Sequence, residues 1–230
     1  MYKRQGEGNF NVTGNAITNV VGNAISNNVF GDAVVTSTIS TNTIVKGDSA
    51  NTIATSGIVG GVGQTGGFTT NTPRWTATVT NNNISGTDGN GILLVAREDV
   101  VHDDTFEMTL RITNNTVAAP LGGTRPGIRV DAGNDVTDDN DVRLEIAGNT
   151  TGGSNGSAGI GVRRQGTDAA APLDNEFGIE GLSPSPANET QTENHISSLN
   201  PNSALGTGAL GGASRALVIN GNNFTSAVVP

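Results

Sequence analysis

Residues Phe106 to Val130, FEMTLRITNNTVAAPLGGTRPGIRV, contain the plan on which the whole chain is built. The stretch begins with a strand of alternating apolar and polar residues and turns at Asn115. It continues through a second short strand and ends in a strand that opens with Gly127 and Ile128. The same order recurs upstream and downstream. Since repeats of roughly 20–50 residues are typical of stacked architectures, we interpret this stretch as one coil of a β-solenoid.

Two features mark each repeat. The first is the pattern [Ile/Val]-x-[Gly/Asn/Thr]-Asn, which ends at Asn15, Asn42, Asn82, Asn115, Asn149 and Asn222. The intervals are 27, 40, 33, 34 and 73 residues, which indicates loops of variable length and an insertion in the last interval. The second feature is a small residue followed by isoleucine, at Ile25, Ile58, Ile92, Ile128 and Ile160. Together they predict an all-β fold, a parallel β-solenoid of five to six coils.

The repeated asparagines have a physical role in this fold. Asparagine tolerates the left-handed backbone of a tight corner, and its amide can bond to the same amide in the next coil. We therefore predict that the six asparagines form a ladder along the stack. The alternative is that asparagine is simply a common turn residue.

Composition restricts the classes of function. The 230 residues carry a formal charge of -9, with 3% aromatic residues, 33 glycines and no cysteine. The acidic balance argues against nucleic acid or an anionic membrane surface as a partner, because both require clustered lysine or arginine. No run approaches the roughly 18 apolar residues of a membrane span, so no membrane insertion is expected.

The chain divides into four segments. Residues 1–5, MYKRQ, match the translated end of a sequencing adapter and are expected to be an artefact attached to a fragment of a longer protein. Residues 6–165 are predicted to form the coils. Residues 166–214 form an insertion with a short helix near 186–199, capped by Ser185 and with Ile196 and Leu199 facing inward. Residues 215–230 supply a final strand, the Asn222 corner and a tail.

Alignment of the coils also predicts charge pairs. Parallel strands in adjacent coils lie about 4.8 Å apart, so outward residues at equivalent positions become neighbours. The alignment places Arg111 beside Glu145 and Asp131 beside Arg163. We expect such exposed pairs to help set the register of the strands rather than to add much stability.

Acidic side chains accumulate in two loops that return to the next coil. The candidate calcium ligands are Glu98, Asp99, Asp103, Asp104, Asp135, Asp138, Asp139 and Asp141. Stacked loops of this kind would favour Ca²⁺, which takes six to eight oxygen ligands. No calcium-loop motif is complete, however, and a solvated acidic ridge that keeps the surface soluble is the alternative.

A second candidate site lies on the outward face of the Gly-Ile strands, where Arg129, Asp131, Arg163 and Arg164 gather. Arginine with carboxylates could bind an acidic sugar and assist proton abstraction. Aromatic platforms for saccharide stacking are scarce, because the chain has one tryptophan and one tyrosine. No catalytic residues are assigned, since the Gly-x-Ser-x-Gly match at Ser154 lacks the strand–turn–helix context of a nucleophile elbow.

The repeats between Asn9 and Gly166, and again from Arg215 to Phe224, resemble the right-handed parallel β-helix repeats of large bacterial extracellular and surface proteins, in the pectate-lyase-like superfamily. The resemblance implies a right-handed coil and a secreted or cell-surface location. It also implies a non-catalytic structural or adhesive module whose partner is the rest of the parent chain. The alternative is a domain that binds or cleaves cell-surface or environmental polysaccharide. Catalytic members use an arginine and carboxylate-bound Ca²⁺, but no motif here matches those residues one by one.

Overall fold

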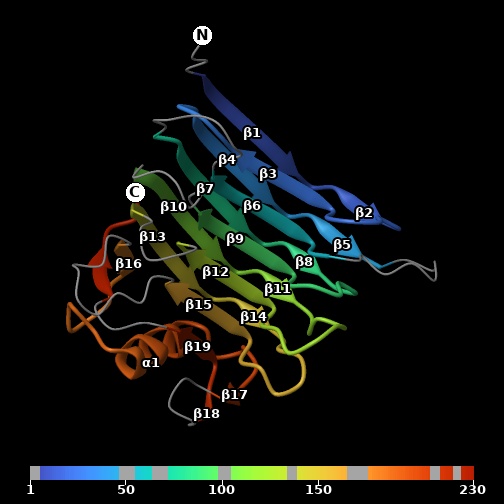
Figure 1. Cartoon of the computed structure of the whole chain (residues 1–230). Coiled ribbons are helices and arrows are strands. Elements are labelled where there is room, and N and C mark those ends of the chain that lie inside the picture. The colour runs from blue at the N-terminus through green and yellow to red at the C-terminus, as the bar shows by residue number, and fades with distance from the viewer. Residues whose placement is uncertain are drawn as a thin grey trace.

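The computed structural model describes residues 6–46, 55–63, 72–97, 105–133, 139–164, 176–207, 213–219 and 224–230. Within them the chain winds into three stacked parallel sheets, so the predicted all-β solenoid with one short helix is confirmed. The artefact predicted at residues 1–5 lies outside these ranges. Figure 1 shows the coils stacked from β1 at one end to α1 at the other.

Each of the first five coils contributes one strand to each sheet. Sheet A has the order β1 (Glu7–Thr13), β4 (Val34–Ser40), β7 (Arg74–Thr80), β10 (Thr105–Thr113), β13 (Asp139–Ala147), β16 (Glu176–Glu180) and β20 (Thr225–Ala227). Sheet B contains β2 (Ala16–Thr18), β5 (Thr43–Val45), β8 (Asn83–Ile84), β11 (Thr116–Val117) and β14 (Thr150–Thr151). Sheet C contains β3 (Ile25–Val29), β6 (Ile58–Gly63), β9 (Ile92–Arg97), β12 (Ile128–Ala132), β15 (Ile160–Arg164) and β19 (Ala216–Ile219). A short antiparallel hairpin, β17 (Gly206–Thr207) and β18 (Ala213–Ser214), precedes β19.

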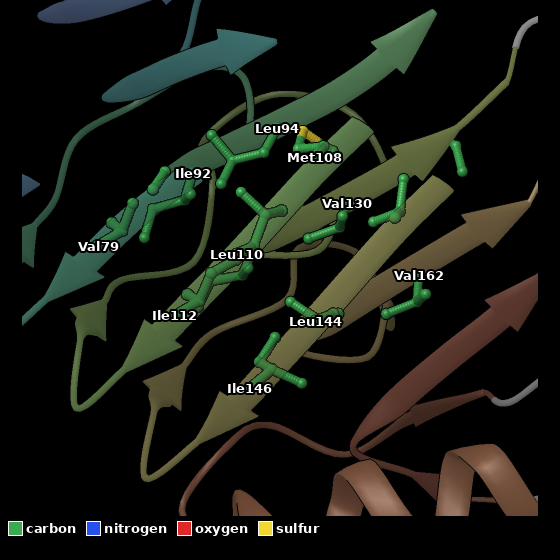
Figure 2. Packing of buried hydrophobic residues seen from close by; sticks show 14 of the residues in the cluster. Val79, Ile92, Leu94, Met108, Leu110, Ile112, Val130, Leu144, Ile146 and Val162 are labelled. Carbon is green, nitrogen blue, oxygen red and sulfur yellow. The ribbon is translucent and has the colours of Figure 1, made fainter. Parts of the chain in front are cut away.

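The core is a column of side chains between sheets A and C. Leu110 of β10 pairs in register with Leu144 of β13, and both are fully buried. Val130 of β12 pairs with Val162 of β15 and faces them from sheet C, as Figure 2 shows. Along sheet A strands such as β7 every second residue is buried, which is why the apolar residues of the repeats occur there with period two.

Trp75 is the largest of these buried side chains, and a small residue must face it across the core. Its Nε1 donates a hydrogen bond to Ser37 Oγ at 2.8 Å. Across the core stands Gly60, where an added Cβ would lie 2.2 Å from Cη2 of the indole. A glycine at this position therefore makes room for the only tryptophan of the chain.

The asparagine ladder forms a continuous column. In each rung the backbone N–H and Nδ2 of one asparagine donate to Oδ1 of the asparagine in the next coil, at 2.9–3.0 Å. The described members are Asn15, Asn42, Asn82, Asn115, Asn149 and Asn200. Asn149 is thus followed by Asn200, not by Asn222 as predicted, and Asn222 lies outside the described residues.

The physical reason given for these asparagines is wrong in one respect. The left-handed residue of each corner precedes the ladder asparagine: it is Gly14, Thr41, Asn81, Asn114 or Gly148, with φ between 53° and 71°. The ladder asparagine is instead selected for its buried amide, which satisfies backbone groups that the corner leaves unpaired. The third position of the motif, [Gly/Asn/Thr], therefore carries the conformational requirement.

The C-terminal part differs from prediction in its boundaries. Helix α1 spans Glu189–Leu199, and its N-cap is Asn188 rather than Ser185. Asn188 Oδ1 accepts the backbone N–H of Gln191 at 2.9 Å, while Gln191 Oε1 accepts that of Asn188 at 2.9 Å. This reciprocal capping box satisfies two N–H groups that a start at Pro186 would leave open.

The two residues predicted to face inward from this helix differ in burial. Ile196 is fully buried as predicted, whereas Leu199 in the last turn is 36% exposed. The strand predicted to end the stack at an asparagine corner, β19, pairs with β15 in sheet C. The strand that joins sheet A in the sixth coil is β16. Helix α1 follows β16 and ends at the ladder corner. The chain after Asn200 then stacks on β14, the last strand of sheet B, where the Ala204 N–H donates to the Thr151 carbonyl at 2.7 Å.

Candidate functional site

The outer face of sheet C carries an arginine cluster. Arg129 and Asp131 alternate with buried Ile128 and Val130 along β12, which turns both charged side chains away from the core. The register places Asp131 directly beside Arg163 of the next coil. Because outward residues of parallel strands stack at the strand spacing, this neighbour follows from the alignment of the repeats.

Asp131 is the centre of this cluster, although it was predicted to be an exposed residue. Its side chain is 0% exposed. Its oxygens accept from Arg129 Nε at 2.8 Å and from Arg163 Nη2 at 2.8 Å, and Arg97 Nη2 lies at 3.5 Å. The stems of these arginines cover the carboxylate while their guanidinium groups remain partly exposed.

Arg97 is the member that sequence reasoning missed. It is the last residue of β9, one coil before Arg129, and its side chain is 47% exposed. Extending the alternation of β9 through Leu93 and Val95 would have placed Arg97 on the outer face. Three guanidinium groups around one carboxylate leave this patch with a formal charge of two positive, on a chain whose net charge is -9.

Arg164 does not belong to this face. It occupies the same column as Ala96 and Ala132, which are fully buried core residues, and it is itself only 3% exposed. Its Nε and Nη2 have no hydrogen-bond partner among the described residues. Desolvation by burial lowers the pKa of the Arg164 guanidinium below its ordinary value. A charged group in this position costs stability rather than serving an exposed ligand.

The calcium hypothesis concerns residues that lie largely outside the described ranges. These are Glu98, Asp99, Asp103, Asp104, Asp135 and Asp138, and the side chain of Asp139 is not described either. Asp141 is described, and its Oδ2 accepts from Arg143 Nη2 at 2.7 Å. In the part of the chain that the structure describes, no group of three or more histidine, cysteine, aspartate or glutamate residues could hold a metal ion.

A second set of charges lies on the outer face of sheet A. Arg111 Nε donates to Glu145 Oε2, as the alignment of the coils predicted, and Arg111 Nη2 donates to the Val229 carbonyl at 3.3 Å. The hydrogen bond and the charge of Glu145 raise the pKa of Arg111 above its ordinary value. Both side chains remain partly exposed, so the pair is worth only about 0–1 kcal/mol.

The arrangement of the arginine cluster limits its chemistry. A general base needs a carboxylate that substrate can reach and that is not already saturated with donors. Asp131 is covered and accepts from Arg129 and Arg163. The partly exposed edges of the arginines can contact an anion, whereas the carboxylate between them is positioned to hold the arginines in place.

The fold defines the class of protein as a parallel β-solenoid, with three sheets per turn and an internal asparagine ladder. No family model, no curated protein and no solved structure matches the chain. Within the described ranges, no helix is both long and apolar enough to cross a membrane.

Proposed function

We propose that this chain is a non-catalytic structural and adhesive module of a larger secreted or cell-surface bacterial protein. The observation that carries the proposal is the state of Asp131, which is fully buried and engaged by arginines from three successive coils. The charged residues that an enzyme would have to present to substrate are used here to join neighbouring coils. Contacts between neighbouring coils stabilise a solenoid, so this use of charge fits a rigid spacer.

The proposal includes a family and a location. The three-sheet coil and the asparagine corner support a place in the pectate-lyase-like superfamily of right-handed parallel β-helices, with the remainder of the parent chain as the main partner. A fold is shared by many functions, so the non-catalytic role rests on the arginine cluster rather than on the fold.

A second candidate function is the binding of an acidic polysaccharide, with or without its cleavage. The observation that favours it is the formal charge of two positive formed by Arg97, Arg129, Arg163 and Asp131 on an otherwise acidic chain. Planar guanidinium groups match the geometry of sugar carboxylates. In this reading the cluster binds the polymer directly, and Asp131 only positions the arginines.

The two functions are separated by assaying the purified chain on pectin- and alginate-like polymers and on neutral polymers, at neutral pH. A structural module is expected to leave the polymer length unchanged and to show no retention on an acidic-polymer column. Shortening or retention that disappears in Arg129→Ala, but persists in Arg143→Ala, would establish the second candidate. Arg143 is the matched control because it is also paired with a carboxylate but lies on sheet A.

The acidic residues carry a separate proposal, that Ca²⁺ binds to Glu98, Asp99, Asp103, Asp104, Asp135, Asp138, Asp139 and Asp141. The measurement is thermal melting with millimolar Ca²⁺ and with Mg²⁺ as the control. A bound ion stabilises the folded state in proportion to the logarithm of its concentration above Kd. An unchanged melting temperature would overturn the proposal and leave the solvated acidic ridge as the explanation.

A further inference from the structure

The two ends of the stack are built differently. At the C-terminal end, Glu193 of α1 accepts the backbone N–H of Val218 in the last strand of sheet C, at 3.0 Å. The carbonyl of Leu199 accepts the N–H of Gly148 at 2.8 Å, and the Asn200 amide continues the ladder. Helix α1 therefore closes this end, and Figure 1 shows it at the opposite end of the stack from β1.

The first coil has no comparable cover in the described part of the chain. Strands β1, β2 and β3 are the terminal members of all three parallel sheets. One row of their backbone groups therefore faces away from the stack, which is the usual template for pairing with another strand. The edges of all three sheets coincide in this one coil, so the template is a complete coil face rather than a single strand.

Apolar side chains mark the same end. Phe10, Val12 and Ile17 occupy core columns but are only partly buried, whereas their counterparts in interior coils, such as Val79 and Ile84, are at most 1% exposed. Outside the strands of the same coil, Val21 and Phe30 are 72% and 47% exposed. Core-column side chains left partly exposed at the end of the stack indicate a surface that a further apolar strand could cover.

The ladder adds chemical specificity to this face. Oδ1 of Asn42 accepts two hydrogen bonds from Asn15, both at 3.0 Å, and each interior rung repeats this arrangement. Oδ1 of Asn15 accepts none among the described residues, while its Nδ2 donates to Thr13 O at 3.2 Å. The face thus ends in an acceptor with the geometry to receive one particular pair of donors, the N–H and Nδ2 of a further ladder asparagine.

We propose that the face formed by β1, β2 and β3 docks one more parallel coil, supplied by the parent chain and carrying an asparagine at the ladder position. This rests on the proposed function, in which the chain is part of a larger protein. The docked coil places an apolar strand over Phe10 and Val12, and its asparagine donates twice to Asn15 Oδ1. Opposite Glu7 it carries a cation, because the equivalent Glu107 bonds Arg74 of the preceding coil at 2.9 Å. The interface repeats the coil–coil contact already present throughout the stack.

The test supplies such a coil from the chain itself. A copy of residues 74–105 is inserted between Gln5 and Gly6 of the full chain, which keeps the 33-residue spacing between paired positions such as Arg74 and Glu107. The copies of Arg74 and Asn82 then fall beside Glu7 and Asn15. We expect amide exchange in β1 to slow by about tenfold or more, while exchange in β13 stays unchanged.

Two control inserts determine what the result means. A scrambled insert of the same composition should leave exchange in β1 at its original rate. An insert whose copy of Asn82 is changed to alanine should give only part of the protection. Equal protection of β1 by the scrambled insert, or no protection by the native repeat, would overturn the proposal. In the extended chain, the change Asn15→Leu should cancel the added protection of β1.

A second copy of the chain is the competing occupant. Sedimentation of the unextended chain measures it directly: a concentration-dependent dimer with protected β1 amides would replace the parent-chain coil by a self-association surface and overturn the proposal. These measurements do not involve polysaccharide. Polymer cleavage would therefore refute the proposed structural role without affecting the docking result. Failure of the native insert to protect β1 would refute the docking proposal without affecting the structural role.

Discussion

Truncation of an interior ladder residue, Asn115→Ala, tests whether the ladder stabilises the stack. Asn115 is 1% exposed, and its Oδ1 accepts from the N–H and Nδ2 of Asn82 at 3.0 and 2.9 Å. Its Nδ2 donates to Val79 O at 2.9 Å and to Asn149 Oδ1 at 3.0 Å. Alanine removes all of these bonds and leaves the backbone N–H of Asn82 buried without an acceptor.

The magnitude follows from these contacts. Each lost hydrogen bond is worth about 0.5–1.5 kcal/mol net, and a buried donor left unsatisfied costs about 1–3 kcal/mol. Since the Nδ2 of Asn82 keeps its bond to Ile39 O at 2.9 Å, only one orphaned donor is counted. We therefore expect Asn115→Ala to lower the free energy of unfolding by about 3–5 kcal/mol.

The matched control is Asn15→Ala, the same change in the first coil. Asn15 is exposed and its Oδ1 accepts from no described residue, while the backbone N–H of residue 15 still donates to Asn42. The expected cost is only about 0.5–1.5 kcal/mol. Urea denaturation followed by circular dichroism gives both values, provided that the slope m is unchanged. Equal costs for the two variants, or less than about 1 kcal/mol for Asn115→Ala, would refute the ladder argument.

Three further predictions use the same denaturation assay. Arg164→Met should stabilise the chain by about 1–3 kcal/mol. Burial lowers the pKa of this guanidinium, so its charged form is less favourable in the folded chain than in the unfolded one, and methionine removes that cost; a loss of stability would show that Arg164 has a stabilising partner. Thr41→Asn should stabilise by about 1 kcal/mol, since a β-branched residue at φ 53° is strained and asparagine occupies the equivalent corners at Asn81 and Asn114; no gain in stability would show that the corner is relaxed. Gly60→Ala should destabilise the chain by about 1–3 kcal/mol, because the added methyl group clashes with Trp75. Trp75→Phe in the same chain should recover part of that loss; no recovery would show that the methyl group clashes with another residue.

Much of the fold could be predicted because a solenoid repeats its constraints. The small-residue–isoleucine pairs predicted the register of sheet C, and Ile58, Ile92 and Ile128 do lie side by side. The pairing of Arg111 with Glu145 followed in the same way. A single coil shows only a weak pattern. Each residue in a column, however, must pack or pair with the equivalent residues of both adjacent coils, so the repeats together restrict the alignment.

The errors arose where the repeat gives way to another element. Asn200 enters the ladder from the C-cap of a helix, so the strand pattern that precedes the other ladder residues is absent. Asp131 was expected to be exposed because alternation gives the direction of a side chain but not what covers it. Its burial depends on three long side chains, one of which, Arg97, comes from a coil earlier than the aligned pair. Arg164 was wrongly grouped with Arg163 on the outer face, because two consecutive residues of a strand point to opposite sides.

The asparagine column also has a direction. Every side-chain carbonyl from Asn42 to Asn200 accepts from the coil before, so the amide dipoles of the column point the same way and polarise one another. The column therefore behaves as an electrical axis through the stack, with its negative pole at Asn15 and its positive pole beneath α1. Lengthening the stack by a coil moves the negative pole outward without reversing it. A coil added at that end must present hydrogen-bond donors to Asn15 Oδ1. The two ends of the solenoid therefore differ in their chemistry as well as in their geometry.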